Sequence, residues 1–410
     1  MAQFSRIILF FFLVCGINSV NAQNSVSDFL LTAFEDINTQ GYDKSINFLS
    51  PKNYRLPVIE DLEFRFGNDE LTLEDQQYAF RFRPGNPWKI RRNNALFNAT
   101  KKELSIRKQL QYQENLEDRY ILVADYLLQI QLKDIEEKKY SLIKKRVDIY
   151  STNMESALFD AKDFVEAKLD QIDAISGQED LNASLSQTKR EITSILQQSD
   201  INWDSGSLIS VSSIEKVSDE VAVQSFSSLE LDLIAQQIEV AKSEVKLEKA
   251  DFDIGYFQTE YYPERDRNSD IGISFGISIP LIKSNKDQIA ERKLDEIELN
   301  NELAFEQFQD SVKRIEEYEY LKTLIAQHKI LADRIKDLDL QTLSKTLRQI
   351  RDNNPLTVLE LEEGMLKLKE LQLRSYKRVV DQYIEFLNTF NVLTRLPLTN
   401  YLSESLEPLE

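Results

Sequence analysis

A stretch of alternating side chains, residues 269–281, constrains this chain more than any other feature. From Ile271 to Ile279 every second residue is Ile or Phe, and Gly or Ser fills the positions between them. This period of two predicts a β-strand with one apolar face and one small, polar face. Because helical patterns lie on both sides of it, the strand belongs either to a small sheet on a soluble helical protein or to a sheet that crosses a lipid bilayer.

The same alternation recurs in three other segments and completes two β-hairpins. The first hairpin covers about residues 58–84 and the second about residues 253–280. Long helical patterns dominate the rest, because the chain has only 10 Gly and 9 Pro in 410 residues to break helices. The predicted long helices cover about residues 94–150, 155–198, 227–250, 289–350 and 356–393, with an interruption near Ser176–Gly177.

This order of elements occurs twice, which indicates a duplicated half-structure rather than an array of short repeats. The first structural repeat would cover residues 23–213 and the second residues 214–396. The matching positions are Pro84 and Pro280 at the hairpin ends, Asn153 and Asn353 at the turns between long helices, and Asp160, Asp163, Glu360 and Glu363 shortly after those turns.

The ends of the chain and two inner segments lack a long periodic pattern. Residues 1–22 start with a positive charge at Arg6, continue as an apolar run and end in small residues, which predicts a secretory signal peptide. The only cysteine, Cys15, lies in this segment, so the mature chain would contain no disulfide. We further predict a short amphipathic helix at 25–38, irregular structure at 41–57 and 200–213, and a C-terminal tail at 397–410.

Composition excludes several functional classes. The chain has 69 Asp and Glu residues against 50 Lys and Arg residues, so it is strongly acidic. This argues against a phosphate-binding surface, and we expect no nucleic-acid partner. With His328 as the only histidine and no Gly-rich phosphate loop, we expect no catalytic triad, metal site or cofactor, and hence no enzyme. After residue 22 no apolar run is long enough for a membrane-spanning helix, so strands would have to cross any membrane.

Four strands per chain are too few to close a barrel, since small transmembrane barrels need about eight, and an open edge in lipid would leave backbone groups unpaired. Three copies of the chain would supply twelve strands. The side chains predicted to face lipid are then Phe64, Phe80, Phe82, Ile273, Phe275 and Ile277. Arg65, Arg81 and Arg83 would line the lumen, where local ion pairing is an alternative to a role in selectivity.

Four segments carry a resemblance to a known family: the helix 235–250, the strand end Tyr261-Tyr262-Pro263, the strand from Gly272 to Leu281, and the turn and helix start from Asn354 to Glu363. In their order and spacing, over nearly the whole mature chain, they resemble the TolC-like outer-membrane efflux and secretion channels. Ile282 stands where the family usually has Phe.

The resemblance implies a mainly α fold with a transmembrane β part: a homotrimer with a 12-strand barrel in the outer membrane and a long α-helical coiled-coil tunnel in the periplasm. It implies a passive exit duct for efflux or type I secretion that works with a periplasmic adaptor and an inner-membrane transporter of the RND, ABC or a similar class. Carried over along the return helix, it puts Glu360 and Glu363 at the channel entrance, with Asp160 and Asp163 as further candidates. Asn153, Asn353, Asn354 and Pro355 would form the periplasmic tip turns.

Two departures from the family pattern stand out. Residues 41–57 replace the long helix that normally precedes the first hairpin, and the tip turn lacks the Gly-Leu pair associated with adaptor docking. Two alternatives stay open. Glu360 and Glu363 can simply be solvated helix residues, and the chain can be a non-channel coiled-coil protein of the periplasm or cell surface, structural or adaptor-like.

Overall fold

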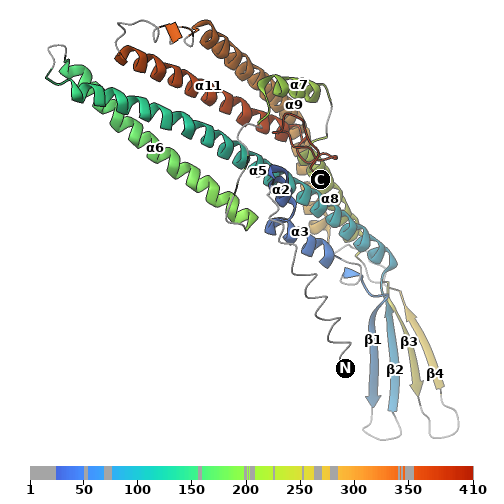
Figure 1. Cartoon of the computed structure of the whole chain (residues 1–410). Helices are drawn as coiled ribbons and strands as arrows, with labels where there is room; N and C mark the ends of the chain where they lie inside the picture. Colours follow the sequence, from blue (N-terminus) through green and yellow to red (C-terminus); the bar gives the residue numbers. More distant parts are fainter. Residues whose placement is uncertain are drawn as a thin grey trace, which may run out of the picture. The chain divides into compact units, whose positions relative to one another are not determined.

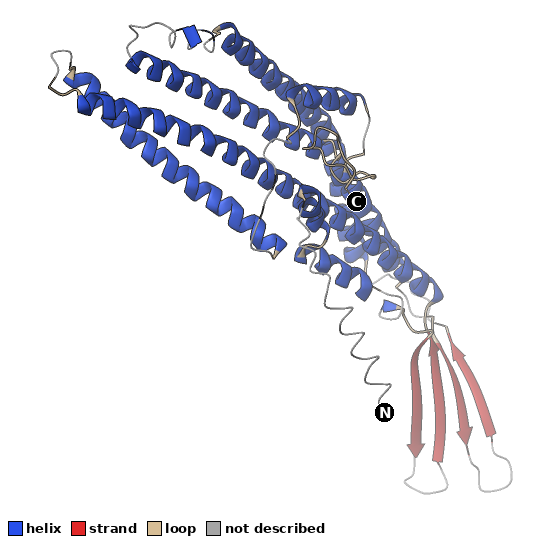
Figure 2. Cartoon of the chain, viewed as in Figure 1, coloured by secondary structure: helices blue, strands red, loops and turns tan. Residues whose placement is uncertain are grey.

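The computed structural model describes residues 25–49, 54–68, 76–155, 159–197, 201, 203, 208–224, 227–251, 254–262, 270–277, 285–339, 342, 345–346 and 355–409. Within these ranges the chain is mainly α-helical and has one four-stranded antiparallel sheet, which confirms the prediction of long helices with two joined hairpins (Figures 1 and 2). The 12-strand barrel of three chains stays a prediction. The predicted signal peptide and the turn residues Asn353 and Asn354 lie outside the described residues.

Contacts divide the chain into two units. One unit combines Met1–Asp36, Gln113–Ser225 and Arg314–Glu410, and the other combines Ile37–Tyr112 and Phe226–Lys313. We refer to them as the first unit and the sheet unit, because the second of them contains the sheet.

The sheet has the strand order β1-β2-β3-β4, with every neighbouring pair antiparallel. Its register places Phe64 opposite Phe80, Phe80 opposite Thr259, and Thr259 opposite Ile273, so each row of side chains crosses all four strands. The two predicted hairpins therefore join through β2 and β3, which leaves β1 and β4 as the edge strands. The strand bounds are β1 Ile59–Asn68, β2 Gln76–Pro84, β3 Tyr256–Tyr262 and β4 Asp270–Gly276.

Of the described helices, four belong wholly or partly to the sheet unit. Helix α8 packs through the stripe Ile234, Ile238, Ala241 and Val245, the 3-4 spacing of a coiled-coil seam. Helix α5 starts seven residues earlier than predicted, because Asn86 Oδ1 accepts the backbone N–H groups of Trp88 and Lys89 and so caps the helix. The helices are α3 Ile37–Phe48, α5 Pro87–Thr152, α8 Leu229–Lys249 and α9 Lys286–Asp337.

The first unit holds the largest buried side chains. Tyr120 of α5, Tyr383 and Phe386 of α11, and Leu321 of α9 are fully buried, so three long helices share one core. The remaining elements of this unit are α2 Val26–Leu31, the 3-10 turn η1 Thr32–Phe34, α6 Ala161–Leu196, α7 Val211–Val223 and α11 Pro355–Thr389.

Two local predictions were wrong, and one helix was missed. Helix α6 continues through Ser176–Gly177, where a Cβ on Gly177 would meet no atom within 4 Å, so the helix is not interrupted there. Gly41 lies inside α3 rather than in an irregular segment. Helix α7 was not predicted at all; it starts in the segment that the sequence pattern marked as irregular.

The C-terminal segment is a packed part of the first unit, which corrects the prediction of a tail. Leu402 and Leu409 are buried. The Leu402 carbonyl accepts the Ile209 N–H at 2.8 Å, and the Tyr120 hydroxyl donates to the Thr399 carbonyl at 2.7 Å. The segment is therefore stabilised by contacts with residues far away in the sequence.

Candidate functional site

The apolar face of the sheet is open to solvent in the single chain. Phe64, Ile273 and Phe275 are 70%, 66% and 74% exposed. All the side chains predicted to face lipid share this face: the register aligns Phe64, Phe80, Phe82, Ile273 and Phe275, and Ile277 follows β4 in the same alternation. Contiguous exposed apolar surface of this kind marks a contact with protein or membrane.

The opposite face of the sheet carries an ion-pair and hydrogen-bond network. Glu63 Oε2 lies 2.7 Å from Arg65 Nη2 and 3.6 Å from Arg81 Nη1. Arg81 Nε donates to Gln258 Oε1 at 2.7 Å, and its guanidinium lies 4.3 Å from the centre of the Tyr256 ring. Arg65 and Arg81 thus share one face and already have local partners.

Arg83, the third predicted lumen residue, lies on the same face. The register puts it opposite Asp61. Each of these two carboxylates on β1 therefore has an arginine of β2 across from it, since Glu63 lies opposite Arg81. Opposite charges at directly facing positions stabilise an antiparallel pair.

The sheet joins its helices through tight backbone contacts. Gly255 has a φ of +112°, and a Cβ at this position would lie 1.8 Å from the Gly276 carbonyl oxygen. Only glycine tolerates both this positive φ and so close an approach of another backbone segment. Asn86 Nδ2 donates to the Ala250 carbonyl at 2.7 Å, and Lys89 pairs with Asp251 at 2.7 Å. The start of α5 is thus attached to the end of α8 where the strands begin.

At the far end of α5, the predicted tip residues have identifiable structural roles. Asn153 caps the end of α5, since its Nδ2 donates to the Ile149 carbonyl at 2.8 Å. Asp160 is the N-cap of α6, where its Oδ1 accepts the N–H groups of Lys162 and Asp163. Pro355 is the first residue of α11, a position at which the missing N–H costs nothing.

The structure brings three of the predicted acidic residues around one tyrosine. Burial raises the pKa of the Tyr150 hydroxyl, and the charges of Asp163, Glu360 and Asp160 raise it further against the opposing effect of Arg146. Tyr150 belongs to a small core with Val147 and Ala167, against which Leu356 packs. Sequence reasoning did not single out Tyr150, although its place near the end of a long helix was a usable signal.

Glu360 and Glu363 differ in their surroundings. Glu360 is exposed, whereas Glu363 is only 3% exposed. Glu363 lies 3.3 Å from Arg146 Nη1 and 2.9 Å from Lys367 Nζ, and Arg146 also pairs with Asp170. In the single chain Glu363 is thus a neutralised, enclosed carboxylate, while Glu360 lacks such enclosure. Their role at a channel entrance stays a prediction.

Comparisons with known proteins point to one architecture. No family model and no curated protein matches the sequence. Solved structures do: the outer-membrane channel OprN has a TM-score of 0.65 and 9% identity, with 89% of each chain covered. The MtrE outer-membrane channel of Neisseria gonorrhoeae, in its open state, has a TM-score of 0.61 and 10% identity over 92% of this chain and 90% of that one.

VceC from Vibrio cholerae has a TM-score of 0.60 and 12% identity over 90% of this chain and 93% of that one. This chain has the TolC-like fold. At such low identity the likeness establishes the fold and leaves the activity to be argued from this chain's own residues. In this fold the two hairpins meet in one sheet, although Arg81 and Gln258, which form a hydrogen bond there, are 177 residues apart in the sequence.

Charged side chains join two long helices of this TolC-like chain at a regular interval. Three pairs link α5 to α11: Arg146 to Glu363, Lys139 to Glu370 at 2.7 Å, and Asp125 to Lys377 at 2.8 Å. The α11 partners are spaced by seven residues, the repeat of a coiled-coil edge. Sequence reasoning missed this ladder, although the heptad spacing was visible.

The middle pair of the ladder is well enclosed. Burial lowers the pKa of Lys139, but the hydrogen bonds with Glu370 and Glu136 outweigh it, so the pKa ends above its usual value. Burial likewise acts to raise the pKa of Glu370, yet the bonds with Lys139 and Arg374 hold it below the usual value. Both groups therefore stay charged near neutral pH.

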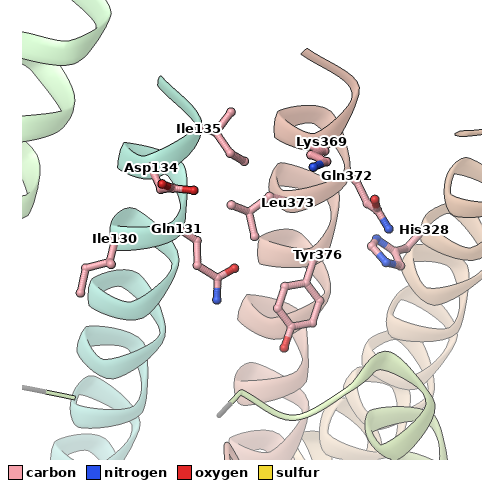
Figure 3. A pocket seen from close by; sticks show the side chains of 9 residues that line it. All are labelled: Ile130, Gln131, Asp134, Ile135, His328, Lys369, Gln372, Leu373 and Tyr376. Carbon is pink, nitrogen blue, oxygen red and sulfur yellow. The ribbon is translucent and has the colours of Figure 1, made fainter. Parts of the chain in front are cut away.

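A cavity of about 490 Å³ lies between α5, α9 and α11 in the first unit, and Figure 3 shows its lining side chains. His328 borders it and is 8% exposed, with Nδ1 3.2 Å from Ser375 Oγ. Burial lowers the pKa of His328, so the imidazole is neutral at pH 7. His328 is thus a buried core residue of the TolC-like fold rather than a surface polar group.

Two features are absent from the described part of the chain. Among its helices none is both long and apolar enough to cross a membrane. No group of three or more His, Cys, Asp or Glu residues is arranged to hold a metal ion among the residues with described side chains.

Proposed function

We propose that this chain is one subunit of a passive outer-membrane exit channel. In the proposed assembly three copies close a 12-strand barrel in the outer membrane, and their long helices form a tunnel in the periplasm. The channel would export solutes by efflux or type I secretion together with a periplasmic adaptor and an inner-membrane transporter of the RND, ABC or a similar class. It needs no catalytic group.

The observation that carries this proposal is the two-faced sheet. One face exposes a continuous apolar surface across all four strands, and the other bears paired charges and small residues. A sheet with water on its polar side and lipid on its apolar side satisfies both faces. Its edge strands β1 and β4 would then pair with neighbouring copies, since lipid offers no hydrogen bonds to an open edge.

A second observation supports assembly of several copies. Helix α9 exposes an apolar stripe of Leu294, Ile297, Phe305 and Phe308, all at least 47% exposed. Such a stripe on a long helix calls for a partner helix. The exposed acidic residues Asp287, Glu291, Glu298 and Glu302 lie on the same part of α9.

The start of α5 offers a surface of complementary charge. Its exposed charged residues are basic: Arg91, Arg92, Lys101 and Lys102. The exposed bases Arg292 and Lys293 of α9 already pair within the chain, with Glu244 and Glu296. Contact between two different surfaces of identical chains is heterologous and generates a ring when the rotation closes. This favours a cyclic trimer over a two-fold dimer.

Two matched variants test the membrane assignment. Ile273→Lys puts a positive charge on the apolar face of the sheet. Ser274→Lys puts the same charge at the next residue of β4, which lies on the polar face. A lysine near the middle of the lipid-facing band costs about 2–4 kcal/mol per chain. We expect Ile273→Lys to abolish assembly in the outer-membrane fraction and Ser274→Lys to preserve it.

The wild-type protein should fractionate with outer membrane, require detergent for extraction, run as a trimer and conduct ions in planar bilayers. The alternative, a non-channel coiled-coil protein, predicts extraction without detergent, no conductance and equal behaviour of the two lysine variants. A soluble monomer with these properties would overturn the proposed function.

A further inference from the structure

The polar face of the sheet carries charges of both signs. Among its described side chains there are three arginines and three carboxylates: Arg65, Arg81, Arg83, Asp61, Glu63 and Glu260. The register places one further carboxylate residue, Asp270 at the start of β4, on the same face as Gly272 and Ser274. Other positions on this face are neutral, as with Ala79 and Gln258. The ion preference of the face therefore depends on which charges are compensated by a neighbour.

Glu63 pairs with two of these three arginines. Its Oε2 accepts from Arg65 Nε at 3.0 Å and lies 2.7 Å from Arg65 Nη2. The same oxygen lies 3.6 Å from Arg81 Nη1. A guanidinium cannot lose its proton in a protein, so its charge is offset only by a nearby carboxylate.

Arg81 would stay in place without Glu63. Its Nε donates to the neutral Gln258 side chain, and its guanidinium stacks on the Tyr256 ring. Only 15% of the Arg81 side chain is exposed, which indicates a firmly held group. Arg65 is different, because its side chain is 51% exposed and is held by its contacts with Glu63.

We propose that Glu63 is the residue that sets the ion preference of this face, because its single carboxylate is shared between Arg65 and Arg81. The inference rests on the proposed function, in which the polar face lines the lumen. Neutralising Glu63 removes one negative charge per chain and leaves Arg65 and Arg81 without their shared carboxylate, and a ring of such sites shifts the preference toward anions.

The test uses full-length channels in planar bilayers under a KCl gradient from about 10 to about 100 mM, where charges act over about 10–30 Å. The reversal potential gives the ratio of potassium to chloride permeability. For Glu63→Gln we expect this ratio to fall about two- to fivefold, since rings of charged side chains set the preference of a pore.

Two further variants separate charge balance from a folding defect. Arg65→Gln changes a half-exposed side chain and should shift the ratio in the opposite direction, toward potassium. The double variant Glu63→Gln/Arg65→Gln removes one charge of each sign and should return the ratio to the wild-type value. Glu220→Gln, an exposed carboxylate on α7 outside the sheet, serves as the charge-matched control and should leave the ratio unchanged.

Conducting Glu63→Gln channels with an unchanged reversal potential would overturn this inference while leaving the channel function intact. A double variant that keeps the full shift of Glu63→Gln would overturn it equally. Should Glu63→Gln fail to assemble, an unshifted Arg65→Gln channel would overturn the inference by itself. A wild-type protein that does not conduct would instead overturn the proposed function, and this inference with it.

Discussion

At the scale of single residues, burial separates two carboxylates that are three positions apart on α11. Glu360 is exposed, whereas Glu363 is enclosed with Arg146 and Lys367. The sequence could not distinguish them, because Arg146 lies far away in the chain, on another helix. The alternation of the sheet was more informative: it predicted which face each of Arg65 and Phe64 would occupy, but it left the ion partner of Arg65 undecided.

We expect Glu363→Gln to destabilise the first unit by about 1–3 kcal/mol, because it leaves a buried guanidinium with fewer charged partners. Asp170 still pairs with Arg146, which limits the loss. The matched control is Glu360→Gln, which changes an exposed group and should alter the free energy of unfolding by less than about 0.5 kcal/mol. Urea unfolding followed by circular dichroism measures both. Equal effects of the two variants would show that the buried pair does not contribute.

His328 makes stability depend on pH. Its pKa in the folded chain lies below the unfolded value of 6.5, because burial disfavours the imidazolium. The unfolded chain therefore binds more protons as the pH falls through about 6.5, and the fold loses stability on the acidic side while keeping it above. The charged groups bordering the same cavity are Asp134 and Lys369.

We expect His328→Gln to make the melting temperature less sensitive to pH between about 6.5 and about 5, the range in which an ordinary histidine titrates. Glutamine can still reach Ser375 with a hydrogen bond, so the neutral-pH packing is retained. Melting curves of the two proteins at several pH values provide the measurement. Parallel pH profiles would contradict the assignment of this dependence to His328.

At the scale of elements, length decided what could be predicted. The long periodic helices α5, α6, α9 and α11 were evident because their few breakers leave an unbroken pattern. The helix α7 and the segment after residue 396 were missed or misread. Both are short and depend on contacts with distant residues, such as Ile209 with Leu402 and Ser213 with Glu404. The interruption expected at Gly177 failed for a related reason: one glycine costs about 1 kcal/mol, which a 36-residue helix packed on α5 outweighs.

The packed C-terminal segment yields a matched pair of substitutions. Leu402 is 3% exposed and Leu396 is 80% exposed. Leu402→Ala should lower the free energy of unfolding by about 2–4 kcal/mol, since it removes buried methyl groups and leaves a cavity. Leu396→Ala should change it by less than about 0.5 kcal/mol. Protease digestion with C-terminal mass analysis adds a local readout, in which early cleavage near residue 402 is expected only for the first variant.

At the scale of the whole molecule, the single chain leaves large apolar surfaces uncovered. The apolar face of the sheet and the stripe on α9 are exposed, while the cores of both units are formed. This contrast is what assembly of several copies in a membrane would resolve. The sequence alone predicted the need for more strands than one chain supplies and an apolar seam with Leu294, Ile297 and Phe308 on this helix. Only the structure showed that the seam is exposed and that the start of α5 offers a basic surface.

We expect Phe308→Glu to prevent assembly without unfolding the chain, because Phe308 is 69% exposed before assembly. Gln309→Glu adds the same charge at an exposed neighbour outside the stripe and should leave the assembly intact. Native mass spectrometry in detergent distinguishes the two, with monomers expected for the first variant and trimers for the second. Trimers of Phe308→Glu would show that the stripe is not an interface.

The open sheet also has a consequence for the life of the chain before it assembles. The sheet has two edge strands, β1 and β4, and one exposed apolar face. Open strand edges beside apolar surface are templates for unwanted strand pairing, a common starting point of aggregation. The helices of both units can fold first, since their buried cores do not include the sheet's apolar face. We therefore expect the newly synthesised protein to need a holding chaperone, or rapid assembly, for the interval in which the outer edges of β1 and β4 are unpaired.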